Sequence, residues 1–158
     1  LVLRFPEILI LTQRAEGFVN ALDTECCKYS MLDLYEFSSP EITLAVEQYI
    51  SENPQTTMIF SSMEYAADII REQLELTNRD YIEIVSCEFT SETKDSIASG
   101  DILAAAGVLP KQFSEDIMDY INAAYNSDAE NIIEIKLNLM TIENLEDMES
   151  SGMLDYLE

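Results

Sequence analysis

Arg14 is one of only eight basic residues in a chain that carries 31 acidic ones. It lies where a short apolar run passes into a helical pattern, and open α/β sheets bind their ligands at such strand-to-helix turns. A guanidinium group there can form paired hydrogen bonds with a carboxylate or with two neighbouring hydroxyl groups. A surface ion pair with Glu16 is the alternative, and the spacing alone leaves both interpretations open.

Residues that support catalysis are scarce. The chain has no histidine, so it can form neither a Ser-His-Asp triad nor a histidine-containing zinc site. Its four glycines make neither of the glycine-rich phosphate-binding motifs. Carboxylates can bind calcium or transfer protons, and one cluster consists of Glu115, Asp116 and Asp119. These three residues fall on the polar side of an expected helix. We therefore expect a protein that is not an enzyme and that has no catalytic residue, metal site or cofactor.

The net charge of −23 is unusually negative for a chain of 158 residues. Such a charge repels the phosphate backbone of nucleic acids and the surface of anionic membranes. We therefore expect this segment to bind neither DNA nor a membrane directly. The acidic residues either form a solvated surface that favours solubility or, as the alternative, imitate DNA and capture a DNA-binding protein.

The cysteines indicate the compartment. There are three, Cys26, Cys27 and Cys87, and two of them are adjacent. An odd number with this spacing does not match the disulfide framework of a secreted domain. We therefore expect a cytoplasmic protein, with an extracytoplasmic location as the alternative.

Apolar patterns alternate between strand-like and helix-like about every 25 residues, which is typical of βαβ units. We predict an α/β fold: a parallel sheet with helices on both faces. Ser38 and Glu41 predict a capped helix start, and Gly100 predicts a left-handed helix end. A further helix begins at Pro110, and its apolar stripe is expected to be buried. The expected strands cover residues 8–11, 31–35, 57–60, 81–85, 102–108 and 133–139, and the stripe consists of Phe113, Ile117, Tyr120, Ile121 and Ala124.

The composition divides the chain into two parts. Residues 1–140 carry the alternating α/β pattern, whereas residues 141–158 contain six carboxylates and no basic residue. We expect this acidic tail to be a helix docked on the domain or, alternatively, a segment that binds a partner. The chain begins with Leu1 rather than methionine, and we expect further residues to precede it.

Five short segments occur in the order found in a known family. They are R-A-E-G-F at 14–18, M-I-F-S-S-M-E-Y-A at 58–66, I-V-S-C-E-F-T-S-E-T at 84–93, A-A-A-G-V-L-P at 104–110 and L-M-T-I-E-N at 139–144. In this order they resemble the carboxyl-terminal lobe of periplasmic sugar-binding proteins and of the effector domains of lac-repressor-type regulators. The resemblance implies a two-lobed clamp that closes on a ligand, with the first lobe encoded before Leu1.

The resemblance also implies which residues bind the ligand, and here the match is partial. Arg14 stands in the place of the family's ligand-contacting arginine, and Glu88 stands where the family has an aspartate. Met63 and Glu64 replace an Asn-Asp pair, and Val108 replaces a glutamine that contacts the ligand. Buried sugar hydroxyls need polar partners, which methionine and valine do not supply. The ligand is therefore less polar than a typical pentose or hexose, or the cleft now serves protein–protein binding.

We expect the effector-sensing domain of a lac-repressor-type transcriptional regulator, a homodimer that binds a small, sugar-like effector. Such a protein would contact DNA only through a domain that is not in this chain. One alternative is an extracytoplasmic solute-binding protein of a sugar transporter or sensor kinase. Another is an acidic interaction module with no small ligand.

Overall fold

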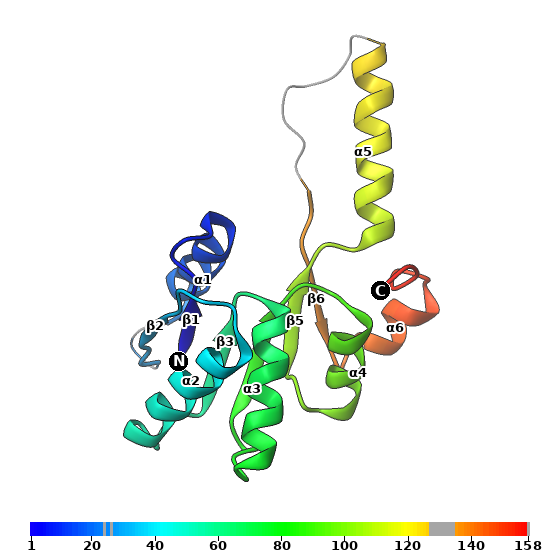
Figure 1. The fold of residues 1–158 in the computed structure, drawn as a ribbon. Coiled ribbons are helices and arrows are strands. Elements are labelled where there is room, and N and C mark those ends of the chain that lie inside the picture. Colours follow the sequence, from blue (N-terminus) through cyan, green and yellow to red (C-terminus); the bar gives the residue numbers. More distant parts are fainter. Residues whose placement is uncertain (24, 26, 127–134, 158) are drawn as a thin grey trace.

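The computed structural model describes residues 1–158 except 24, 26, 127–134 and 158. Strands and helices alternate along the described chain (Figure 1). In chain order they are β1 (Val2–Arg4), α1 (Leu9–Ala21), β2 (Met31–Asp33), α2 (Ser39–Glu52), β3 (Met58–Ser61), α3 (Glu64–Leu76), β4 (Glu83–Cys87), α4 (Ser91–Ser99), β5 (Ala104–Gly107), α5 (Pro110–Tyr125), β6 (Asn138–Thr141) and α6 (Leu145–Ser150).

The six strands form one sheet in the order β2-β1-β3-β4-β5-β6. Strands β1 to β5 are parallel to one another, and β6 runs antiparallel to β5. The α/β prediction is therefore confirmed, with one antiparallel strand added at the edge. Because parallel strands all end on the same side, the residues that follow β1 to β5 gather along one edge of the sheet, called the carboxyl edge below.

Helices cover both faces of this sheet, as predicted. On one face α1 packs through Ala15 and Phe18 onto Val2, Phe60 and Cys87. The opposite face holds the larger core. Most of its buried members come from the strands and from α2, α3, α4 and α6, and they include Leu3, Ile59, Ile84, Ile42, Ile70, Ile97 and Leu145. Neighbouring strand residues face opposite layers, as the pleat requires.

The strand predicted at 8–11 is wrong. The first strand is Val2–Arg4, and the predicted segment lies at the start of α1. Leu9 and Ile10 are 71% and 54% exposed, whereas Val2 and Leu3 are at most 1% exposed. A short apolar run does not by itself distinguish a buried strand from a helical turn, and burial by neighbouring strands selected the earlier segment.

The predicted helix ends and the remaining predicted strands were confirmed in most cases. Gly100 ends α4 with φ 87°, so the left-handed cap is confirmed. Ser38 precedes α2 as predicted, but its side chain makes no capping hydrogen bond, so the predicted capping box does not form. The predicted strands near residues 31, 57, 81 and 102 correspond to β2, β3, β4 and β5.

Helix α5 contradicts the prediction of a buried stripe, because none of its 16 residues is buried. Figure 1 shows α5 extending away from the sheet, so the sheet and the other helices do not cover it. The strand predicted at 133–139 begins outside the described residues, and β6 itself spans Asn138–Thr141.

The acidic tail contains helix α6 and a turn that follows it. Leu145, Met148 and Leu154 are buried in the larger core. Lys94 Nζ lies 3.1 Å from Glu149 Oε1, which joins α6 to α4. Apolar burial and this ion pair therefore hold the tail against the sheet.

Candidate functional site

The candidate site lies at the carboxyl edge, where polar and aromatic residues follow neighbouring strands. Phe5 follows β1, Phe37 follows β2, and Ser62 follows β3. Glu88 follows β4 and Val108 follows β5. Since the strand order is β2-β1-β3-β4-β5, these residues occupy successive positions along one edge, the place where open α/β sheets bind ligands.

Arg14 joins two of these positions. It projects from α1, and its Nη1 donates to the backbone carbonyl of Ser62 and to Glu88 Oε1, both at 3.1 Å. Within the described chain the Nε and Nη2 groups of Arg14 have no hydrogen-bond partner. A guanidinium has five N–H donors, so three of them remain available. The arginine is thus oriented by the protein while it keeps donors for a ligand.

Glu88 is held in an unusual backbone conformation. Its φ is 76°, in the left-handed region that residues other than glycine seldom adopt. Its backbone N–H donates to the carbonyl of Ala106 at 2.8 Å, which ties the residue to β5. The side chain is 47% exposed and reaches Arg14. Strained residues of this kind cluster at functional sites, and they persist only where surrounding contacts hold them in place.

Cys87 is the last residue of β4 and immediately precedes Glu88. Its side chain is buried, and burial raises the pKa of the thiol to about 11, although the nearby Arg14 opposes the shift. The thiol is therefore protonated at neutral pH and is a poor nucleophile. Cys87 serves in packing against α1, together with Phe60.

The other predicted site residues are not all brought together. Glu64 begins α3 and accepts a hydrogen bond from Thr90 Oγ1 at 3.0 Å, so it is joined to α4. Met63 packs partly against the larger core. Val108 is half-buried beyond β5. No hydrogen bond or ion pair links any of these three to Arg14 in the described chain, and their part in ligand binding stays a prediction.

Two residues at this edge were missed by sequence reasoning. Phe37 stacks on the buried Phe5 with ring centroids 5.1 Å apart and remains 39% exposed. Ser62 is fully buried, and its hydroxyl has no hydrogen-bond partner in the described structure. An aromatic residue shortly after a strand was the available signal for Phe37. Ser62 contributes a backbone carbonyl, which residue type does not encode.

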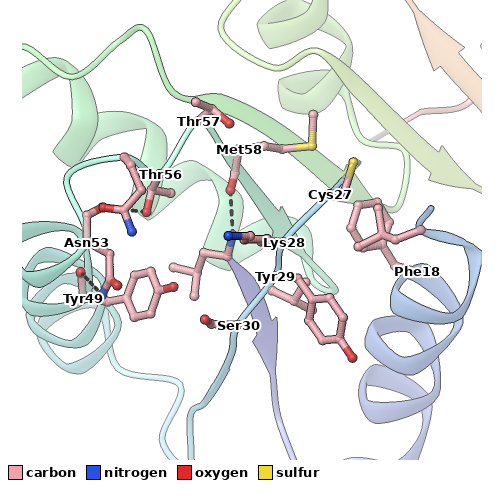
Figure 2. A pocket seen from close by; sticks show the side chains of 14 residues that line it. Phe18, Cys27, Lys28, Tyr29, Ser30, Tyr49, Asn53, Thr56, Thr57 and Met58 are labelled. Atoms are coloured by element: carbon pink, nitrogen blue, oxygen red, sulfur yellow. Dashed lines mark hydrogen bonds between the residues drawn. The ribbon is translucent and has the colours of Figure 1, made fainter. Parts of the chain in front are cut away.

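A cavity of about 670 Å³ opens at the opposite edge of the sheet, near the amino ends of the strands (Figure 2). Phe18, Ser30, Tyr49, Thr57 and Met58 are among the residues that line it. Several of its polar groups are already paired: the amino group of Leu1 donates to Met58, and the Thr56 hydroxyl to Asn53. The cavity contains neither Arg14 nor Glu88, and the carboxyl edge therefore remains the better candidate.

The described residues contain neither a metal-binding cluster nor a membrane-spanning helix. No group of three or more cysteine, aspartate or glutamate side chains is arranged to hold a metal ion there. Across the same part of the chain, no helix combines the length and the apolar character that spanning a bilayer requires.

Sequence comparison identifies no relative: no protein-family model matches the chain, and no curated protein does. Solved structures do match. The arabinose-binding protein AraP of Geobacillus stearothermophilus has a TM-score of 0.80 at 15% identity, over 92% of this chain and 55% of that protein.

Two other structures give similar values. A carbohydrate transporter solute-binding protein of Agrobacterium radiobacter, in complex with D-arabinose, has a TM-score of 0.79 at 17% identity, over 98% of this chain and 54% of that one. A periplasmic ribose ABC transporter protein of Conexibacter woesei has a TM-score of 0.80 at 10% identity, over 94% and 52%. The chain thus spans about half the length of these proteins, and it has the fold of one lobe of a periplasmic-binding-protein-like module.

Proposed function

We propose that the chain is one lobe of an extracytoplasmic binding protein for a sugar-like solute, and that it acts in transport or sensing. The observation that carries the proposal is Arg14, which bridges Ser62 and Glu88 at the carboxyl edge and keeps unpaired donors. Guanidinium and carboxylate groups side by side supply donors and acceptors for adjacent hydroxyls. Phe37, which follows β2 and is 39% exposed, adds an apolar ring further along the same edge.

This proposal departs from the regulator that the sequence led us to expect. The similar structures described above are an arabinose-binding protein, a carbohydrate transporter solute-binding protein and a periplasmic ribose ABC transporter protein, so they favour the solute-binding alternative and a location outside the cytoplasm. A homodimer and DNA contact through another domain belong to the regulator hypothesis and have no support here.

A second lobe is part of the proposal. Phe113 and Ile121 belong to the apolar stripe of α5 and are 39% and 50% exposed. Large apolar side chains exposed along one side of a helix indicate a surface that a partner covers. We propose that α5 packs on a second lobe of the full-length protein, which would place the carboxyl edge at the interlobe cleft. Residues 1–140 would then form the ligand-binding lobe, with 141–158 as its docked tail.

The test is ligand-induced thermal stabilisation of the full-length protein with arabinose, ribose and other sugars. We expect at least one sugar to raise the Tm, since a ligand that binds only the folded state stabilises it. In R14A the affinity for that sugar should fall by roughly 10- to 100-fold, because hydrogen bonds to a charged group contribute about 1.5–3 kcal/mol.

Arg79 provides the matched control. It precedes β4, at the opposite edge of the sheet, and none of the described hydrogen bonds or ion pairs involves its side chain. R79A should keep the affinity of the unmodified protein. Equal affinities in R14A and the unmodified protein would remove Arg14 from the site, and no stabilisation by any sugar would favour the interaction module without a small ligand.

A further inference from the structure

The cavity of about 670 Å³ at the amino ends of the strands lies in line with β1 (Figure 2). Leu1 and Val2, at the start of β1, form part of its lining. The rest of the lining includes residues 28–30, which precede β2, and residues 53 and 55–58, which precede or begin β3. Because β1 lies between β2 and β3 in the sheet, the cavity follows the path of a β1 strand that begins earlier.

The backbone at the start of β1 bonds to its two neighbours in turn, as parallel pairing on both sides requires. The amino group of Leu1 donates to the Met58 carbonyl, and the Leu1 carbonyl accepts from the Phe60 N–H, both at 2.8 Å. The Val2 N–H instead donates to the Ser30 carbonyl at 2.9 Å. Leu1 therefore bonds toward β3 and Val2 toward β2. A residue before Leu1, called the preceding residue below, would bond toward β2 again.

The strand register fixes which backbone groups the preceding residue would meet. Because Val2 pairs with Met31, the preceding residue would pair with Tyr29. Its N–H would donate to the Lys28 carbonyl, and its carbonyl would accept from the Ser30 N–H. Both residues line the cavity, and no hydrogen bond of the described chain involves either of these backbone groups. The described chain thus leaves to solvent one donor and one acceptor that a longer β1 would pair.

The amino group of Leu1 also favours a longer strand. A charged amino group has three N–H donors, and in the described chain its one hydrogen-bond partner is the Met58 carbonyl. Burial lowers the pKa of this group, because a charge that leaves water is destabilised. A peptide N–H in the same place has one donor and no charge, so the Met58 carbonyl would satisfy it completely.

The lining of the cavity suits an uncharged polypeptide backbone. None of its 14 residues is acidic, although the chain carries 31 acidic residues. Phe18 packs in the cluster that contains Val2, and Tyr49 packs against the larger core together with Leu1. Side chains alternate between the two faces along a strand. The side chain of the preceding residue would therefore lie on the face of Phe18, where an apolar residue is expected.

We propose that this cavity is a slot for extended polypeptide, and that residues joined to Leu1 in the full-length protein continue β1 through it. The chain spans only about half the length of the matched structures, which leaves ample length for such a segment. The continued strand would tie the amino ends of β2 and β3 together. The slot lies at the edge opposite Arg14 and Glu88, so the proposal does not depend on the proposed function.

The experiment is amide hydrogen exchange of the full-length protein, followed by NMR at single residues. The Ser30 amide should exchange at least about 100-fold more slowly than the Tyr29 amide, because only Ser30 donates to the continued strand. Tyr29 is the matched control. It belongs to the same exposed segment, and because β2 is an edge strand, the Tyr29 N–H faces away from β1.

Two other exchange results would overturn the proposal. Equally fast exchange of Ser30 and Tyr29 would mean that the cavity is open to a small molecule or to another protein. Equally slow exchange would mean that a covering surface protects both amides, without strand pairing. The residue directly before Leu1 gives a second test, since proline has no N–H for the Lys28 carbonyl. A proline at that position would contradict the pairing.

Discussion

Helices α3 and α5 have the same kind of sequence pattern but lie in different surroundings. Both place apolar side chains at helical spacing along one side. In α3 that side is buried, with Ile70 at 1% and Leu74 at 3% exposure. In α5 no residue is buried, and Tyr125 is 90% exposed. An apolar stripe therefore predicts that a helix has a face to be covered, but it does not say which surface covers it.

Hydrogen exchange should show the largest difference between the two helices. Amides in the centre of α3 should exchange only through global unfolding, which in domains of this kind costs about 5–15 kcal/mol. Amides of α5 should exchange at least about 100-fold faster, since no buried contact restrains the helix. Mass spectrometry of the isolated chain gives the comparison. Equal protection of the two helices would mean that α5 is packed in solution.

Substitution of a buried residue in α3 should have the next largest effect. I70A removes most of a side chain that is 1% exposed, and such changes cost about 2–5 kcal/mol. L76A, on the same helix, removes a side chain that is 79% exposed and should change the unfolding free energy by less than about 0.5 kcal/mol. Urea denaturation measures both, and similar losses would contradict the described orientation of α3.

The smallest effect, and the one that tests the missing contact, concerns α5. I121A should change the unfolding free energy of the isolated chain by less than about 0.5 kcal/mol, because Ile121 is half exposed there. In the full-length protein the same substitution should cost on the order of 2 kcal/mol, if the second lobe buries it. An equally small loss in both would show that α5 stays uncovered.

The sequence located part of the candidate site. The sequence predicts Arg14 from its place at a strand-to-helix turn and Glu88 through the family resemblance, and the structure brings the two together at 3.1 Å. The sequence predicts Glu64 as a site residue as well, but the structure bonds it to Thr90, and no described hydrogen bond joins it to Arg14. Neighbouring side chains determine which partner a carboxylate chooses, and residue type does not reveal that choice.

Other features of the site could not be predicted. Ser62 accepts from Arg14 through its backbone carbonyl, and every residue has such a carbonyl. Phe37 lies at this edge because β2 pairs with β1 and because its ring stacks on Phe5. Contacts of this kind depend on strand order, which local patterns do not contain.

The amino-acid sequence by itself determined the alternation of strands and helices, the left-handed end of α4 at Gly100 and the presence of an apolar stripe on α5. These properties follow from backbone preferences and from periodicity, both of which act over a few residues. Only the tertiary structure decided that the first strand is Val2–Arg4, that α5 remains uncovered and that Arg14 spans Ser62 and Glu88. Those outcomes depend on which surfaces meet, because burial and hydrogen bonding join residues that are distant along the chain.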